Sequence, residues 1–258
     1  MGMANSSSGE TVLQRTMRVL HCFDAENARL GASEIARRSG LPSSTAHRLV
    51  VELTSVKLLE RFSDGKYGIG THAWETFVRA NPLERMRLQA QTILSDVREE
   101  LGQYVCLAVP DFVDRTILYV ERFDSTDSQL RLLGRHAGRL DLHTTSLGLV
   151  MLAFASPQTI KAVTSSPFKD SISGDITDGA AVAAMLPEIR ATGHFVFVGG
   201  LIPENTAVAA PVFDRKGVVR ASVGVVARND EIDVNQAVSV VLDACQKLSV
   251  RLQKDSLY

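Results

Sequence analysis

The segment that decides the N-terminal fold is residues 33–55, which read SEIARRSGLPSSTAHRLVVELTS. Ser33 is placed to cap a helix over residues 34–38, with an acidic residue in its first turn and two arginines in its last. Gly40 is placed to end that helix in a left-handed conformation. Leu41-Pro42-Ser43-Ser44 then supplies an apolar anchor, a residue that cannot continue the first helix, and two capping hydroxyls. A second helix is therefore predicted over residues 45–55.

This second helix carries two different faces. The apolar face comprises Ala46, Leu49, Val50 and Leu53. The other face is mostly polar, has no acidic residue before Glu52, and comprises Ser44, His47, Arg48 and Val51. Both sets follow helical spacing, so one face is predicted to be buried and the other to be open to a partner.

The flanking segments extend the motif on both sides. Residues 11–23 hold apolar side chains at helical spacing, at Leu13, Met17 and Leu20. Residues 57–62 and 66–69 flank Ser63-Asp64-Gly65, and an Asp-Gly step between two such runs is a strong hairpin signal. Three helices followed by a hairpin predict a winged helix-turn-helix. A small helical subdomain with a solvated polar face would leave the hairpin unexplained.

The charge is distributed unevenly. Lys plus Arg number 28 and Asp plus Glu number 29, so the net charge of −1 taken alone argues against a polyanion partner. Residues 37–66, however, hold six basic and three acidic side chains, which gives +3 there and −4 over the rest of the chain. DNA attracts even a small positive face. Because an excess of +3 is modest, we predict that useful affinity for DNA depends on two such faces in a dimer.

The predicted winged helix-turn-helix offers a set of candidate DNA contacts. The second helix of the motif is predicted to enter the major groove, with hydroxyl and imidazole groups at base edges and Arg48 and the first backbone amides at phosphates. The hairpin would contact the DNA backbone or minor groove. The candidate DNA-binding residues are Ser43, Ser44, Thr45, His47, Arg48, Arg61 and Lys66.

The remainder of the chain predicts a second domain. A helical stretch at residues 74–78 and a longer helix over 83–101 read as a connector that ends at Gly102. Beyond it, helical segments at 147–155, 180–192 and 234–254 alternate with strands, and two hairpins are expected, at 104–123 and 206–227, with a further strand at 130–133. We therefore expect an α+β chain with a disordered tail at 1–9, a winged helix-turn-helix at 10–73, connector helices at 74–102, and a sensor and oligomerisation domain at 103–258.

Several other classes of protein are disfavoured. Cys22, Cys106 and Cys245 are widely spaced and are expected to be core residues rather than disulfide or zinc ligands. His136, Asp141 and His143 are candidate metal ligands, but no further ligand follows them at a recognisable spacing, so no metal is expected. Ser146 lacks the nucleophile elbow of a hydrolase, so no catalysis is expected. No phosphate-binding glycine loop is present, and no cofactor is expected. The sequence shows neither a signal-peptide pattern nor a membrane-length apolar run, so a cytoplasmic protein is expected.

The chain from about residue 11 onward resembles the IclR family of bacterial transcriptional regulators. The resemblance rests on the segments SEIARRSGLP (33–42), STAHRL (44–49), LDLHTTSLG (140–148) and AAPVFD (209–214). It implies a GAF-like C-terminal domain that binds a small molecule, often an organic acid or aromatic catabolite. It also implies a homodimer or dimer of dimers on a palindromic double-stranded DNA operator, and no membrane partner.

The resemblance also implies an effector pocket, made of Gln129, Leu132, Leu140, Ser146, Leu147, Phe197, Ala207, Gly224 and Val226. Phe197 stands where the family often has an acidic residue, Ala207 where it often has a cysteine, and Gly224 and Val226 where hydroxyl residues are frequent. The loss of these polar groups predicts an aromatic or otherwise partly apolar acid, whose carboxylate would be held by backbone amides near Ser146 and Leu147. The alternative is a C-terminal domain that only dimerises and binds no ligand.

Overall fold

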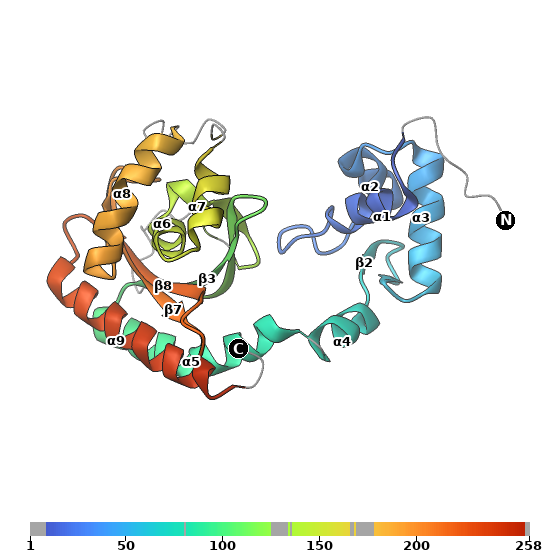
Figure 1. Ribbon diagram of the computed structural model, residues 1–258. Coiled ribbons are helices and arrows are strands. Elements are labelled where there is room, and N and C mark those ends of the chain that lie inside the picture. The colour runs from blue at the N-terminus through green and yellow to red at the C-terminus, as the bar shows by residue number, and fades with distance from the viewer. Residues whose placement is uncertain are drawn as a thin grey trace. The chain divides into compact units, whose positions relative to one another are not determined.

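A computed structural model shows the chain as two compact units, divided after Asn81 (Figure 1). The structure describes residues 9–79, 81–124, 134, 136–165, 168 and 178–255. Each unit has its own hydrophobic core, and each is described by itself.

The first unit is a winged helix-turn-helix, as predicted. Its elements are α1 (Val12–Leu20), α2 (Ala32–Ser39), α3 (Ser43–Ser55), β1 (Leu59–Arg61), β2 (Tyr67–Ile69) and α4 (Thr71–Arg79). β1 and β2 pair antiparallel, with Glu60 opposite Gly68. The core takes one face of each of the first three helices, and Val19, Ile35, Ala46 and Val50 are buried within it.

The helix ends correct two details of the sequence prediction. Gly40 ends α2 in the left-handed conformation, with φ of 62°, as expected. α2 begins at Ala32 after Gly31, so the prediction of Ser33 as its N-cap is wrong. The reason is that Leu30 exchanges both backbone hydrogen bonds with Tyr67 of the wing, at 2.8 and 2.9 Å, which fixes the chain just before the helix. α3 begins at Ser43 after Pro42 without a side-chain cap, so the predicted hydroxyl cap is also wrong.

The second unit is built on one six-stranded antiparallel sheet in the order β5-β4-β3-β8-β7-β6. Its strands are β3 (Tyr104–Asp111), β4 (Thr116–Phe123), β5 (Arg139–Asp141), β6 (Phe195–Val198), β7 (Asn205–Phe213) and β8 (Val219–Arg228). Its helices are α5 (Pro82–Leu101), the short 3-10 helix η1 (Leu142–Thr144), α6 (Ser146–Ala153), α7 (Pro157–Thr164), α8 (Gly179–Thr192) and α9 (Val234–Gln253).

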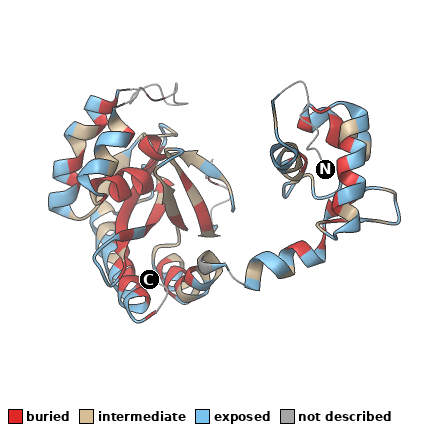
Figure 2. Cartoon of the chain, turned by 45° about the vertical axis from the view of Figure 1, so that its right-hand side comes forward, coloured by how far each residue is buried: buried red, intermediate tan, exposed pale blue. Residues whose placement is uncertain are grey.

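Helices cover both faces of this sheet (Figure 1). Alternate strand residues such as Val105, Leu107 and Val225 pack with α5 and α9 in one core. The intervening residues, such as Tyr104 and Cys106, face α6 and α8 in a second core. Figure 2 shows buried residues gathered in the strands and on the inner helix faces. The pleat thus assigns each strand residue to one of two layers.

Both hairpins predicted in the second domain are confirmed by their strand registers. β3 runs through Pro110 and Asp111, where the sequence predicted the turn, and the connection falls at residues 112–115 instead. The strand predicted at 130–133 lies outside the described residues. All three cysteines are free and buried, as expected. Within the described ranges, no helix is long and apolar enough to cross a bilayer.

Candidate nucleic-acid surface and ligand pocket

The outer face of α3 is open, as the two-faced pattern predicted. Ala46, Leu49, Val50 and Leu53 are buried, with at most 5% of their surface exposed. Ser43, Ser44, His47 and Arg48 are exposed and Thr45 is half-buried. The predicted base-contacting residues therefore lie on the solvent side of a helix whose opposite side is fixed in the core.

Arg48 is only weakly restrained. Its Nε lies 3.7 Å from Glu52 Oε1, and both side chains are more than half exposed, so the pair is weak. On α2, by contrast, Arg37 and Arg38 contact Glu34 at 2.6 and 2.7 Å. Their hydrogen bonds lower the pKa of Glu34 to about 2. Because α3 has no acidic residue in its first turn, its N-terminal end presents no negative charge to a phosphate.

The wing is a tight hairpin with two exposed cations. Asp64 accepts a hydrogen bond from the backbone N–H of Lys66 at 3.0 Å, and Gly65 has φ of 79°, as an Asp-Gly turn requires. Lys66 and Arg61 are exposed, and the Arg61 guanidinium lies 5.7 Å from the centre of the Tyr67 ring. Both predicted wing cations are thus open to solvent.

A third cation lies beside the wing. The guanidinium carbon of Arg29 sits 3.8 Å from the centre of the Phe62 ring, a cation–π stack that restrains an exposed side chain. Gly68 permits this arrangement, because a Cβ there would lie 2.7 Å from the Ala28 carbonyl oxygen and 2.9 Å from Phe62. Sequence reasoning missed Arg29, since only the pairing of Leu30 with Tyr67 brings its segment to the wing.

The second unit contains a pocket whose floor is one row of residues across four adjacent strands. Tyr104 of β3 pairs with Val226 of β8, Val226 pairs with Ala207 of β7, and Ala207 pairs with Phe197 of β6. Ala207 and Val226 are only partly buried although they lie on inner strands, because they border empty space. Two aromatic rings therefore flank two small side chains, which leaves a slot over the middle of the row.

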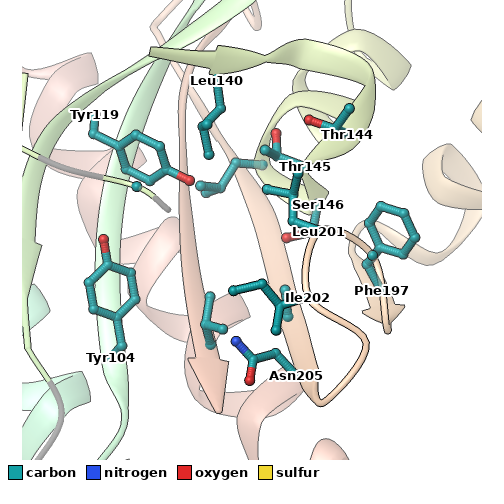
Figure 3. Close-up of a pocket in the computed structure, with 15 residues that line it drawn as sticks. Tyr104, Tyr119, Leu140, Thr144, Thr145, Ser146, Phe197, Leu201, Ile202 and Asn205 are labelled. Atoms are coloured by element: carbon teal, nitrogen blue, oxygen red, sulfur yellow. The ribbon is translucent and has the colours of Figure 1, made fainter. Parts of the chain in front are cut away.

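The roof of the pocket comes from α6, the segment before it and one loop (Figure 3). Ser146 and Leu147 contribute from the first turn of α6, Thr145 is its N-cap, Thr144 ends η1, and Leu140 comes from β5. The remaining lining residues are Tyr119, Gly134, Gly200, Leu201, Ile202 and Asn205. The space within this lining is about 550 Å³, part of it open to solvent.

Six of the predicted effector-binding residues line this pocket: Leu140, Ser146, Leu147, Phe197, Ala207 and Val226. Gly224 does not line it, because Leu147 packs directly on it, and a Cβ at Gly224 would lie 2.9 Å from Leu147 Cδ2. Gln129 and Leu132 lie outside the described residues. The residues that sequence reasoning missed include Tyr104, Tyr119 and Asn205, although strand pairing of Tyr104 with Val226 would have found the first.

Polar groups reach the pocket from two sides. Thr145 caps α6 by accepting the Gly148 N–H at 3.0 Å, and the N–H groups of Ser146 and Leu147 in the first turn have no acceptor within the helix. Tyr104 is 1% exposed, and within the described ranges its hydroxyl has no hydrogen-bond partner. Burial raises the pKa of Tyr104 and of Tyr119, so both phenols are neutral near pH 7.

His143 lies behind this roof as a core residue. It is 2% exposed, its ring stacks on Phe168 with a centroid distance of 3.9 Å, and burial lowers its pKa. In the ranges that the structure describes, no three His, Cys, Asp or Glu side chains gather as metal ligands would. His143 therefore packs as an aromatic ring.

Comparison with known proteins identifies the family. Residues 12–62 match the IclR helix-turn-helix domain, and residues 83–250 match the bacterial transcriptional regulator IclR C-terminal domain. The chain therefore belongs to the IclR family of bacterial transcriptional regulators, and it is a DNA-binding regulator rather than an enzyme.

Individual relatives agree with this assignment. The HTH-type transcriptional regulator BhcR of Paracoccus denitrificans is 26% identical over 95% of this chain and 88% of its own. The transcriptional repressor IclR of Escherichia coli is 28% identical over 57% of this chain, and the match spans 54% of that protein. An IclR homolog from Microbacterium hydrocarbonoxydans, solved in complex with 4-hydroxybenzoate, is 32% identical with a TM-score of 0.85, covering 94% of this chain and 99% of that one.

Proposed function

We propose that this regulator binds an aromatic or otherwise partly apolar organic acid in the pocket of its second unit, and that the bound acid controls operator binding. The observation that carries the proposal is the floor of the pocket. Tyr104 and Phe197 stand at its ends with Ala207 and Val226 between them, so the middle of the floor is lined by small apolar side chains that leave room for an aromatic ring.

The start of α6 supplies the complement to a carboxylate. The N–H groups of Ser146 and Leu147 lie in the first turn, where the helix dipole favours negative charge, and Ser146 adds a hydroxyl. The apolar lining from Leu140, Leu201 and Ile202 favours an acid that also carries substantial apolar surface. The complex of the Microbacterium relative with 4-hydroxybenzoate supports the same class of ligand.

Calorimetry with a panel of acids tests this proposal. We expect benzoate-type acids to bind more tightly than two- or three-carbon oxoacids, because only the former fill the apolar slot. Tight binding of a small oxoacid without binding of any aromatic acid would refute it. A complete lack of binding across the panel would favour the alternative, in which the second unit only dimerises.

We further propose how the first unit contacts DNA. In this arrangement α3 enters the major groove, Ser43, Ser44, Thr45 and His47 face base edges, and Arg48 contacts a phosphate. On the wing side, Arg61, Lys66 and Arg29 contact the backbone of the adjoining groove. The exposure of all three cations and the open face of α3 support this assignment.

The operator is proposed to be palindromic and the active species a dimer or dimer of dimers in the bacterial cytoplasm, where the DNA partner is found. Exposed apolar side chains support a second copy of the chain. Leu13 of α1 is 77% exposed, and Trp74 and Phe77 of α4 are 64% and 63% exposed. Trp74 and Phe77 are three residues apart and so share one face of α4, and an exposed apolar face of this kind is typical of an interface. Sedimentation equilibrium tests this directly, since a monomer at micromolar concentration would contradict it.

A further inference from the structure

The hydroxyl of Tyr104 is a buried polar group that the described part of the chain leaves unsatisfied. The residue is 1% exposed and lines the pocket, and its oxygen has no hydrogen-bond partner among the residues that the structure describes. Buried hydroxyl groups nearly always have a partner in folded proteins, because burial without one costs stability. A phenylalanine would fill the same volume of the pocket floor without that cost. We therefore expect the hydroxyl to form a hydrogen bond with a ligand that enters the pocket.

The neighbours of Tyr104 that the structure describes do not supply that partner. Its ring packs near the Arg122 guanidinium, whose carbon lies 5.7 Å from the ring centre. Arg122 itself donates to the Gly134 carbonyl at 3.0 Å and pairs with Asp124 at 2.5 Å. Val226, opposite Tyr104 in the sheet, is apolar. Since burial keeps the phenol protonated, Tyr104 presents both a donor and an acceptor.

The position of Tyr104 in the pocket indicates which part of a ligand would meet it. In Figure 3, Tyr104 and Tyr119 stand on one side of the cavity, while Thr145 and Ser146 at the start of α6 stand across it. The lining between these two sides is apolar and includes Leu201, Ile202 and Ala207. A ligand that spans the pocket thus meets polar groups at its two ends and apolar side chains in the middle.

We propose that Tyr104 recognises a hydrogen-bonding substituent at the end of the effector remote from its carboxylate, so that the effector is a hydroxy-substituted aromatic acid. This inference rests on the proposed function, in which the carboxylate lies at the start of α6. It adds a specificity-determining residue, because a site that holds a buried hydroxyl discriminates against an analogue that cannot pair with it. The preference would come from Tyr104 rather than from the size of the slot.

The first test compares three probes on the unmodified full-length protein by calorimetry: 4-hydroxybenzoate, 4-methylbenzoate and benzoate. The methyl group is similar in size to the hydroxyl and forms no hydrogen bond. One net hydrogen bond corresponds to about a two- to ten-fold change in affinity, so we expect 4-hydroxybenzoate to bind at least that much more tightly than 4-methylbenzoate. Equal affinity of these two probes would overturn the inference.

The second test places the preference on one oxygen atom. Tyr104→Phe is expected to weaken 4-hydroxybenzoate binding about two- to ten-fold and to leave benzoate binding unchanged. Tyr119→Phe removes a hydroxyl from the same side of the pocket and serves as the matched control, with a smaller effect on the same ratio. Loss of the preference in Tyr119→Phe but not in Tyr104→Phe would overturn the assignment to Tyr104.

The two proposals fail in different ways. If the unmodified protein binds none of the three aromatic acids, the proposed function fails and the inference fails with it. If it binds all three with equal affinity, the proposed function stands and only the role of Tyr104 is overturned. A thermal melt of Tyr104→Phe without ligand checks that the variant is folded, and the probe comparison on the unmodified protein decides the question if it is not.

Discussion

Enlarging Ala207 should close the proposed effector site while leaving the protein folded. Ala207 lies between Val226 and Phe197 in the floor row and is partly exposed to the cavity. Ala207→Leu adds three carbon atoms to that space. Each buried methylene contributes about 0.8 kcal/mol, or about 2.4 kcal/mol for three, and an overpacked site costs about 1–3 kcal/mol. These opposing effects keep the unliganded stability of the variant within about 2 kcal/mol of the unmodified protein.

Thermal denaturation measures both effects in one experiment. A ligand at 100 times its dissociation constant adds about 2.7 kcal/mol to the stability of the unmodified protein. For a unit of this size that corresponds to an increase in Tm of about 5 to 10 °C. We expect the same aromatic acid at the same concentration to leave the Tm of Ala207→Leu unchanged.

The matched control is Ala207→Ser, which changes polarity at the same position but preserves most of the space. It should retain a ligand-dependent increase in Tm. If Ala207→Leu folds and still binds the aromatic acid with unmodified affinity, the acid occupies another site and the reasoning from the floor row is refuted.

Three further predictions concern DNA binding and stability. Arg48→Ala should weaken operator binding in fluorescence anisotropy and reduce the salt slope by about 0.9 per lost phosphate contact, whereas Lys216→Ala in the second unit should change neither. Arg29→Ala should also make the salt slope shallower, and an unchanged slope would remove Arg29 from the interface. Asp214 accepts hydrogen bonds from the backbone N–H groups of Lys216 and Val218 and from Arg220, at 2.7 to 2.9 Å. Burial alone would raise the pKa of Asp214, but these donors lower it, so its carboxylate contributes stability that is lost as the pH falls. Asp214→Asn should therefore cost about 1 to 2 kcal/mol in urea denaturation at pH 7 and less below about pH 4; a cost independent of pH would contradict this.

The winged helix-turn-helix was largely predictable because its sequence signals are local. The two faces of α3 follow from helical spacing alone, and the Asp64-Gly65 step specifies the wing turn. The start of α2 was not predictable, because a tertiary contact determines it. Pairing of Leu30 with Tyr67 fixes the chain there, and neither partner carries a local signal for the other. Arg29 was missed for the same reason.

The pocket was predictable only in part. Family resemblance indicated Ala207, Phe197 and Val226, but it could not show which of the indicated residues remain uncovered. Leu147 covers Gly224, which is a matter of how closely α6 approaches the sheet. Tyr104 gave no signal in the sequence, since a tyrosine in a strand is ordinarily a core residue. Its importance depends on a hydroxyl that has no hydrogen-bond partner in the described part of the chain.

The floor row also affects how the ligand specificity of such a regulator can change. Its four side chains occupy fixed register positions on strands whose opposite face packs against α5 and α9. Each of these side chains can therefore change in size or polarity without altering the backbone pairing of the sheet or the winged helix-turn-helix. A sensor built on this sheet can be retuned to a new inducer by a few point substitutions, which makes it a practical starting scaffold for engineered biosensors.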